Sequence, residues 1–431
     1  FEGGFDARAN GLGGAGQTGG DGFGGMAGAN AIIGSIAIGT DASAFSQGVG
    51  GDASFGFGGD GGQGRGGNAF FRADGTASET ALVTIAGNAL VNASGIGGIG
   101  GPSNGVAIGA GRGGNGYGGQ FTVPNQADPA FNSGVFLLAG GDNGTISIGG
   151  AAEATARGFG GTGGSGAGAN TGGPGGDGFG GLAQVGLARL GGTGAIGNGS
   201  ANLGNVLAQA DGVGGTGGIG AGPAAPAGAG GHGEGGFAAF TLSAGQVGAN
   251  SVAFSANGIG GSGASGGRGQ GGTAAMFGGF GGEASITEAL LEARGEGGAA
   301  EAGLGGEGRG GVAAIEGDGL EIGIVGIAGL IASARGGDAS NGPAGNALGG
   351  EAYIATLSPD NGGGVTIGGH ARIFANAIGG TSSGSFAAGN GTGGLAYVDA
   401  LGGGSVTLSS AQVHAVGIGG TAEVHEGGNG S

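Results

Sequence analysis

The feature that most constrains this chain is a short alternating stretch that ends in a pair of glycines and recurs along the sequence. Its last copy closes at Gly419-Gly420. Counting back from the first glycine of that pair, the positions eight, six and four residues earlier hold Ala411, Val413 and Ala415. Small apolar residues at every second position predict a β-strand with one buried face.

Closing glycine pairs divide residues 1–431 into a single array of about nine to ten units. Their spacing runs from 37 residues, between Gly13 and Gly50, to 63 residues, between Gly97 and Gly160. Such spacings are typical of solenoids and other repeat arrays. The pairs are Gly13-Gly14, Gly50-Gly51, Gly97-Gly98, Gly160-Gly161, Gly214-Gly215, Gly260-Gly261, Gly297-Gly298, Gly336-Gly337, Gly379-Gly380 and Gly419-Gly420.

The three alternating positions are small or apolar in every repeat, with Ser46 as the polar exception. Positions between them include polar residues such as Arg157 and Asp211. We therefore expect one dry and one wetter face, and a glutamate at Ala154 to disrupt folding more than one at Thr155. The alternating positions are Phe5, Ala7, Ala9; Ala42, Ala44, Ser46; Ala89, Val91, Ala93; Ala152, Ala154, Ala156; Val206, Ala208, Ala210; Val252, Phe254, Ala256; Ala289, Leu291, Ala293; Ala328, Leu330, Ala332; Ala371, Ile373, Ala375; and Ala411, Val413, Ala415.

In five repeats the apolar face extends further back along the chain. A small residue separates the two halves, which predicts a bend or a close approach of backbones. The earlier apolar positions are Ile36/Ile38, Val83/Ile85, Ile146/Ile148, Ile322/Ile324 and Val365/Ile367, and the separating residues are Thr40, Gly87, Gly150, Gly326 and Gly369.

A second motif, Gly-Gly-x-Gly-x-Gly-Gly, opens most repeats, and we number its positions as slots one to seven. Glycines at slots two, four and six would line one face of a β-strand. Those at slots one, four and seven would line one edge of a polyglycine or polyproline-II helix, and the sequence leaves both backbones open. The motif spans residues 19–25, 61–67, 113–119, 175–181, 230–236, 266–272 and 305–311, and weaker copies end at Gly349-Gly350 and Gly393-Gly394.

Glycine supplies 136 of the 431 residues, yet the 8 prolines and the missing Gly-X-Y triplet exclude a collagen helix. Aromatic residues are 5% of the chain, so we expect no conventional core of large side chains. Backbone packing closer than the usual ~10 Å between sheets would then supply much of the stability, and repeats must stack. The predicted fold class is an all-β repeat: a Gly-rich β-solenoid or layered β-sheet with polyglycine- or polyproline-II-like segments.

The net charge of −18 comes from a chain in which every basic residue is arginine. Without a basic patch, neither nucleic acid nor an anionic membrane surface is an expected partner. Cysteine is absent, which excludes disulfides and thiolate sites. No apolar run approaches the ~20 residues of a membrane helix, so no membrane span is expected. A chain that starts at Phe1 is expected to be a processed product or a fragment.

The glycine motif does not predict a nucleotide or calcium site. A phosphate loop needs a lysine that this chain lacks. The calcium-binding nonapeptide of β-rolls needs aspartate at slot six, and here Asp21 and Asp177 occupy slot three. We therefore expect no metal and no cofactor. The slot-six residues are Gly24, Gly66, Gly118, Gly180, Gly235, Gly271 and Gly310.

Titratable residues form no pattern typical of catalysis, so we expect that the protein is not an enzyme. The histidines, His232, His370, His414 and His425, have no metal-ligand spacing. The densest charged region is interpreted as a solvated face. It contains Glu288, Glu292, Arg294, Glu296, Glu301, Glu307 and Arg309.

Gly-Val-Gly-Gly, Gly-Ile-Gly-Gly and Gly-Phe-Gly-Gly closures occur together with Val-Thr-Ile and Val-Thr-Leu strands. In these features the whole chain resembles the Gly/Ala-rich β-strand-repeat surface proteins of bacteria, including autotransporter-like and filamentous adhesins. The resemblance implies secretion to the cell surface, a β-solenoid or related fold, and adhesive or matrix roles. The glycine tracts are also similar to those of mycobacterial surface proteins, although the alternating strands fit that group less well. Neither resemblance assigns a functional residue.

The leading hypothesis is an extracellular structural protein that forms or belongs to a filament, fibre or surface matrix. Self-association, head-to-tail or lateral, is expected because neither end of the array has a polar cap. The alternative is a cell-surface adhesin that binds a surface or glycan ligand through loops, with a polysaccharide-active enzyme on a β-helix as the third hypothesis. Candidate binding loops are Pro102–Gly109, Asn125–Ser133 and Gly222–Gly228.

Overall fold

The computed structural model describes residues 2–54, 57–76, 78–105, 108–119, 134–141, 143–188, 199–221, 225–356, 363–424 and 427–431. Within these ranges the chain forms β-strands and no helix. Successive strands of each layer pair in parallel, each with the equivalent strand of the coil before and after it. The fold is therefore all-β, repetitive and β-solenoid-like, as the sequence predicts.

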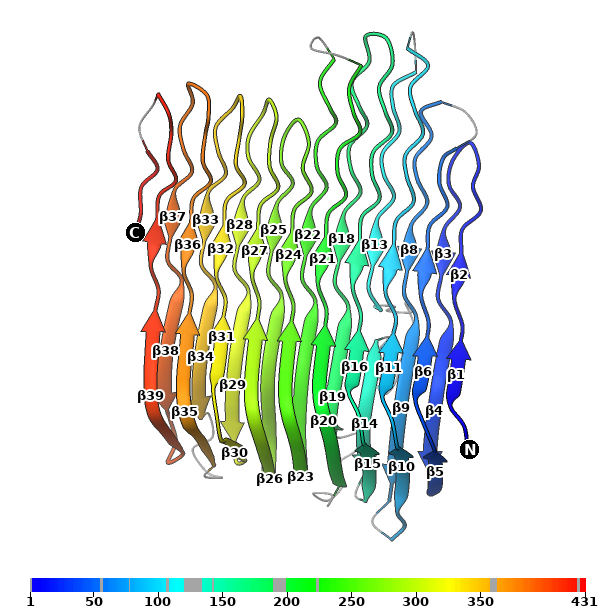
Figure 1. Ribbon diagram of the computed structural model, residues 1–431, viewed down its shortest axis with the longest axis vertical. Coiled ribbons are helices and arrows are strands. Elements are labelled where there is room, and N and C mark those ends of the chain that lie inside the picture. Colours follow the sequence, from blue (N-terminus) through cyan, green and yellow to red (C-terminus); the bar gives the residue numbers. More distant parts are fainter. Residues whose placement is uncertain are drawn as a thin grey trace.

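One coil of the solenoid has two regions, which Figure 1 shows one above the other. In the lower region a first strand runs down, the chain turns, and a second strand returns upward in a second layer. In the upper region the chain continues into an ascending glycine-rich arm, turns at the tip, and descends in a second arm to the next coil. We call the lower region the β-sandwich and the upper region the glycine arms.

The two layers of the sandwich belong to one 21-stranded sheet, because β23 and β26 run through both layers. The first layer contains β4 (Met26–Ile32), β9 (Asn68–Gly75), β14 (Val135–Gly141), β19 (Leu182–Ala188), the first part of β23 (Phe237–Ser255) and of β26 (Thr273–Glu292), β29 (Val312–Asp318), β34 (Glu351–Thr356) and β38 (Leu395–Ala400). The second layer contains β1 (Phe5–Arg8), β5 (Gly34–Ile38), β6 (Ala42–Phe45), β10 (Ala81–Ile85), β11 (Ala89–Asn92), β15 (Gly144–Ile148), β16 (Ala152–Thr155), β20 (Gly199–Gln209), the remainder of β23 and β26, β30 (Glu321–Ile324), β31 (Ala328–Ile331), β35 (Gly364–Phe374) and β39 (Ser405–His414).

Each arm contributes a strand of two residues to a separate sheet. The ascending arms form the sheet of β2 (Gly11–Leu12), β7 (Gly48–Val49), β12 (Gly95–Ile96), β17 (Gly158–Phe159), β21 (Gly212–Val213), β24 (Gly258–Ile259), β27 (Gly295–Glu296), β32 (Ala334–Arg335), β36 (Ala377–Ile378) and β40 (Gly417–Ile418). The descending arms form the sheet of β3 (Gly22–Phe23), β8 (Gly64–Arg65), β13 (Gly116–Tyr117), β18 (Gly178–Phe179), β22 (Gly233–Glu234), β25 (Gly269–Gln270), β28 (Gly308–Arg309), β33 (Ala347–Leu348) and β37 (Gly391–Thr392).

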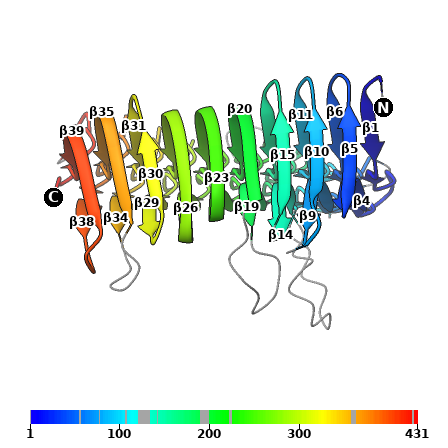
Figure 2. The same ribbon diagram turned by 90° about the horizontal axis from the view of Figure 1, so that it is seen from below.

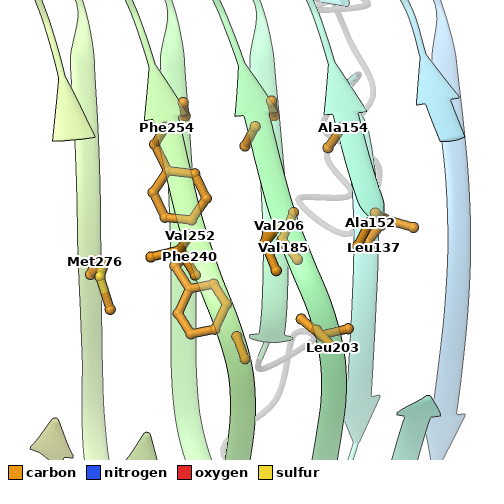
Figure 3. Packing of buried hydrophobic residues seen from close by; sticks show 14 of the residues in the cluster. Leu137, Ala152, Ala154, Val185, Leu203, Val206, Phe240, Val252, Phe254 and Met276 are labelled. Atoms are coloured by element: carbon orange, nitrogen blue, oxygen red, sulfur yellow. The ribbon is translucent and has the colours of Figure 1, made fainter. Parts of the chain in front are cut away.

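Figure 2 shows the two sandwich layers from below. A continuous hydrophobic core runs along the axis between these layers. Phe240 and Met276 of the first layer and Val206 and Phe254 of the second all belong to this core (Figure 3). The rings of Phe240 and Phe254 are 6.0 Å apart. The expectation that large side chains form no conventional core is therefore wrong for the sandwich, because the few large residues concentrate on its inner faces.

The predicted facing of the second strands is confirmed in all the inner coils, where the alternating positions are buried. The exception at Ser46 is accommodated because its hydroxyl donates a hydrogen bond to the carbonyl of Gly25. In the last coil Ala411 and Val413 are exposed, since no further coil covers them. The early apolar pairs such as Val83 and Ile85 are buried on the same face.

The opposite face is less wet than the alternation predicts at two positions. Asp211 is buried, and its carboxylate Oδ2 lies 3.3 Å from Nε of Arg157 on the neighbouring coil. Thr155 is also buried, and its hydroxyl donates a hydrogen bond to Glu153. Placing both residues on a wet face was wrong because in-register neighbours on this face cover each other.

The bend between the two halves of the second strand is confirmed as a close approach of backbones. The amide of Gly87 donates to the carbonyl of Thr40, and the amide of Gly150 donates to Gly87. A methyl group at Gly150 would lie 2.9 Å from the carbonyl carbon of Gly87. In β35 the chain passes this point without a break, and its register shifts between Ile367 and His370.

Hydrogen bonds between the ascending and descending arms replace a side-chain core in the upper region. Amides alternate between the two layers along the axis, so that Gly98 donates to Gly62, Gly114 to Gly98, and Gly161 to Gly114. A methyl group at Gly116 would lie 2.1 Å from the carbonyl oxygen of Phe159 in the opposite layer. The glycine arms can therefore pack backbone against backbone because slots such as this one carry no side chain.

Candidate functional surfaces

The sequence predicts no catalytic or cofactor residue, so the surfaces formed by side chains of the glycine arms are the first candidates for function. In each two-residue strand the first residue faces the other layer, and the second points outward. Because the strands are in register, equivalent outward residues line up in columns along the solenoid axis. Each outer face of the arms therefore carries columns of side chains at the spacing of strands in a sheet, about 4.8 Å.

Side chains at slot three form a ladder that the sequence analysis did not anticipate. The Oδ1 atom of Asn115 accepts the amide N–H of Asp177 at 2.9 Å, and Asp177 accepts that of His232 at 2.8 Å. Nδ1 of His232 in turn accepts the amide of Arg268 at 2.9 Å. Each acceptor binds the equivalent residue of the next coil, so these polar residues satisfy arm amides that point out of both layers.

The ascending arms carry a similar ladder just before their two-residue strands. Oδ1 of Asp211 accepts the amide of Asn257, and Oδ1 of Asn257 accepts the amide of Arg294, both at 2.8 Å. Residue type varies along these ladders while the position stays fixed. The signal that would reveal them in the sequence is an acceptor side chain at one repeat position, without any single conserved residue type.

The outer face of the descending arms has an aromatic stack at its N-terminal end. Arg65 lies between the rings of Phe23 and Tyr117, with its guanidinium carbon 5.8 and 4.9 Å from the ring centres. Tyr117 and Phe179 stack at 5.0 Å with an angle of 9° between the rings. Neighbouring coils therefore already occupy most of these ring faces, which favours a stabilising role over the binding of a flat ligand.

The outer face of the ascending arms is more apolar. We call its outward positions the ascending column. Ile259, Ile378 and Ile418 are exposed on it, and Val213 is half-buried. The column comprises Leu12, Val49, Ile96, Phe159, Val213, Ile259, Glu296, Arg335, Ile378 and Ile418.

A groove of about 780 Å³ runs along the axis where the descending arms join the first sandwich layer. Glycine pairs of successive coils form its floor, including Gly271-Gly272 and Gly310-Gly311. Its walls mix charged residues such as Glu234 and Glu351 with apolar residues such as Leu395. The groove follows from the glycine motif itself, because two adjacent residues without side chains leave a trough between two columns.

Two tyrosines stack beside this groove. The rings of Tyr353 and Tyr397 are 5.0 Å apart and nearly parallel, and the hydroxyls donate hydrogen bonds to Glu316 and Glu351 respectively. Burial, followed by the hydrogen bond to Glu351 and its negative charge, raises the pKa of Tyr397 to about 12. The same causes, with Glu316 as the acceptor, raise the pKa of Tyr353 further. Both phenols thus act as hydrogen-bond donors at neutral pH.

The titratable residues named from the sequence do not come together in one site. Nδ1 of His370 lies 2.8 Å from the hydroxyl of Ser410, and His414 packs on Phe374. His425 lies outside the described residues. Among the described residues, no three histidine, cysteine, aspartate or glutamate side chains gather closely enough to hold a metal ion. The slot-six glycines such as Gly118 instead pack against carbonyl groups of the opposite layer.

The densest charged region is spread over several surfaces. Glu292 pairs with Arg294, and Glu307 pairs with Arg309 at 2.9 Å. Glu296 lies on the outer face of the ascending arms, whereas Glu307 lies on that of the descending arms. This separation follows from the path of the coil, which distributes nearby residues in the sequence over opposite faces.

Two of the candidate loops lie at the tips of long arms, and the third, Asn125–Ser133, lies outside the described residues. In Pro102–Gly109, Oδ1 of Asn104 accepts the amide of Ile108. The described part of Gly222–Gly228 includes Gly228, whose amide donates to Gly218. The described parts of residues 97–115, 160–177 and 214–232 extend further from the sandwich than residues 260–268, as Figure 1 shows.

Comparisons of the chain with known protein families, with curated proteins and with solved structures find no match. Among the described residues, no helix is long and apolar enough to cross a membrane.

Proposed function

We propose that this protein is an extracellular structural protein that forms, or belongs to, a filament, fibre or surface matrix. The observation that carries the proposal is the continuity of backbone hydrogen bonding from coil to coil in both regions of the molecule. A fold whose main contacts are between successive copies of one unit is suited to extension along its axis. The extracellular location rests on the resemblance to bacterial surface repeats.

Open strand edges support assembly by stacking. Among the described residues, β39 pairs on one side with β35, and its opposite edge is unpaired. Ala411 and Val413, which occupy core positions of this coil, are exposed there. Further coils, supplied by the same polypeptide or head-to-tail by a second copy, would pair this edge and bury these side chains.

The arms contribute to this role through two kinds of backbone, and we infer that slots one to three are of the polyglycine-II type. In the copy at residues 61–67, the amide of Gly61 bonds within its layer, that of Gly62 bonds across to Gly51, and that of Gln63 bonds to the side chain of Asp21. Three directions in three residues are typical of a threefold helix. Slots four and five then continue as the two-residue strand β8.

Electron microscopy of the purified full chain tests the structural proposal. We expect particles that elongate with concentration along one axis, with a repeat of about 4.8 Å along that axis in diffraction. Particles that stay one chain long at every concentration, while circular dichroism reports β-structure, would contradict assembly by this chain. Labelling of intact cells with an antibody against the arms tests the extracellular location, and signal after permeabilisation alone would contradict it.

A second candidate function is a cell-surface adhesin that binds a surface or glycan ligand at the arm tips. The specific observation in its favour is that three neighbouring arms are longer than the rest. Replacing residues 167–170 at one tip by two glycines shortens that arm without touching the sandwich. Loss of binding to a glycan array by this variant, with unchanged thermal unfolding, is the expected result for an adhesin. Unchanged binding would exclude this tip.

A further inference from the structure

The ascending column carries apolar side chains on consecutive coils from Leu12 to Ile259 and again at Ile378 and Ile418, and all of them are half-buried or exposed. Ile259, Ile378 and Ile418 are 37%, 46% and 51% exposed, whereas the residues next to them in the chain are buried or half-buried. Contiguous exposed apolar surface of this kind marks interaction sites in soluble proteins. In the neighbouring outward column, Thr162 and Thr216 are polar and uncharged, whereas Asp52 and Asp338 are charged.

One pair of charges interrupts the ascending column. Glu296 of β27 and Arg335 of β32 are exposed, lie on consecutive coils, and are direct partners in the register. Glu296 forms no ion pair among the described residues, and Arg335 bonds to Asp338 on its own coil at 3.1 Å. The column thus has one negative and one positive charge in neighbouring coils, with apolar residues on both sides of them.

This order makes the column complementary to itself. A twofold axis in the plane of the face, parallel to the strands and midway between Glu296 and Arg335, reverses the solenoid axis of a second copy. It places Glu296 of one copy opposite Arg335 of the other, and the reciprocal pair forms at the same time. On either side, Ile259 then faces Ile378. Closed twofold dimers are formed by such self-complementary patches.

We propose that two copies of this chain pair laterally, face to face, through the ascending column about this axis. This inference rests on the proposed structural function, and it identifies the surface through which neighbouring chains would contact each other laterally. Among the described coils, six overlap in the pair, and Val213 lies opposite Ile418 in the outermost of them. Because successive outward residues share the same spacing in both copies, every overlapping coil meets a coil.

The flanking columns permit the same arrangement. On the sandwich side of the ascending column, Arg294 faces Ser333 of the second copy, and Asn257 faces Asn376. On the tip side, Ser262 faces Thr381. No like charges come opposite each other in these columns. Arg294 is in addition neutralised within its own coil by Glu292.

The outer face of the descending arms is less suited to such pairing. Its outward positions include Glu234, Gln270 and Arg309, and a comparable axis through Gln270 would pair Glu234 with Arg309. The same axis passes beside Arg268, which lies two residues before Gln270, and therefore sets Arg268 against its own copy. Like charges held opposite each other disfavour that interface.

The size of the contact predicts a weak dimer. Six coils at about 4.8 Å each cover about 29 Å along the axis, and the three columns span about 20 Å across it. The resulting area, about 600 Å² per copy, is below the roughly 800 Å² of a standard interface. In an assembled stack the same contact repeats on many chains, which increases its total strength by multivalency.

Charge reversal on the full chain tests the proposal. Glu296→Arg and Arg335→Glu each place like charges across the axis, so we expect each variant alone to dimerise at least tenfold more weakly in sedimentation equilibrium. Mixing the two variants restores opposite charges and should restore pairing as heterodimers. The double variant Glu296→Arg/Arg335→Glu should pair like the original chain. Glu234→Arg, on the other face, is the matched control and should change nothing.

Several results would overturn the proposal. These are single variants that pair as well as the original chain, a mixture that stays unpaired while circular dichroism reports folded protein, or an equal loss in the Glu234→Arg control. Electron microscopy of the same samples separates this failure from failure of the structural function. If the single variants elongate along the axis and also keep their lateral pairing, the proposed contact through the ascending column is wrong and the structural function stands. Chains that neither elongate nor pair contradict both.

Discussion

The β-sandwich and the glycine arms use the same stacking of coils but fill the space between their layers in different ways. In the sandwich, inward side chains such as Phe254 and Leu291 pack between the layers. In the arms, carbonyl and amide groups of opposite layers meet directly, as between Gly98 and Gly62. One chain can thus build a core from side chains or from backbone, and glycine decides which. We therefore expect the sandwich to be destabilised when an inward side chain becomes polar, and the arms to be destabilised when an inward glycine gains a side chain.

The largest expected effect is a charge placed inside the sandwich. Leu291 is fully buried, whereas its neighbour Leu290 is 40% exposed on the outer face. Leu291→Glu buries an unpaired carboxylate and should destabilise the fold by about 4 kcal/mol or more. Leu290→Glu, the matched control, should cost about 1 kcal/mol or less. Thermal unfolding followed by circular dichroism measures both, and equal losses would refute the assigned facing.

This pair is sharper than Ala154 and Thr155, the positions that the alternation suggests. Because Thr155 is buried by its in-register neighbours, Thr155→Glu also introduces a charge without full access to water. Leu290 and Leu291 differ in facing alone.

A single methyl group in the arms should have the next largest effect. Gly116→Ala sets a Cβ atom 2.1 Å from a carbonyl oxygen of the opposite layer, and the layers must separate locally. We expect a loss of about 2–3 kcal/mol, as for overpacking of a core. Gly109→Ala has no atom within 4 Å of its new Cβ and should be neutral or stabilise by about 0.4–1 kcal/mol.

Denaturant unfolding compares these two variants. Equal stability of both would contradict the close packing of the arms. Ala334, Ala347 and Ala377 already occupy inward arm positions, where they pack on one another in adjacent coils. We therefore expect the loss of stability for a single methyl group between the layers. Where alanines occupy equivalent positions in adjacent coils, one local widening between the layers accommodates all of them.

The side-chain ladders of the arms should have a smaller effect. Asn257→Ala removes the acceptor of the Arg294 amide and should cost about 1 kcal/mol. Asn257→Asp keeps an acceptor oxygen and serves as the control. Hydrogen exchange at the Arg294 amide gives the readout, with faster exchange in the alanine variant alone. Equal protection in both variants would show that this ladder does not hold the amide.

The smallest effect is expected at high pH in the sandwich. Because the pKa of Tyr397 in the folded chain is raised from 10.0 to about 12, the unfolded chain loses this proton first. The stabilising contribution is therefore complete below about pH 10 and is lost as the pH rises from about 10 to about 12. Tyr397→Phe should flatten the pH dependence of thermal unfolding in this window. An unchanged slope would contradict the role of the Glu351 hydrogen bond.

The sequence predicts the sandwich better than the arms. Alternation with a period of two identifies the inner face of each second strand, from Ala42 to Ala375, because burial selects small and apolar residues there. It cannot reveal that Asp211 is buried, since that burial depends on Arg157 of a neighbouring coil. It also underestimates the core, because composition averages the large residues of the sandwich over the glycine of the arms.

For the arms, the glycine motif predicts close packing but neither the partners nor the direction of each amide. Slots one, two and three bond in three different directions, which no single periodicity encodes. The slot-three ladder was missed because Asn115, Asp177 and His232 share an acceptor atom and no residue type. Candidate surfaces such as the ascending column depend on register between coils and thus on the three-dimensional stack.

Residue-resolved amide hydrogen exchange of the full chain tests most directly whether the arms are a hydrogen-bonded core rather than a tether. We predict that the amides of Gly114 and Gly161, which bond between the arm layers, exchange as slowly as that of Val91 in the sandwich. Exchange of both glycine amides at the rate of an unstructured chain, while Val91 stays protected, would contradict the account.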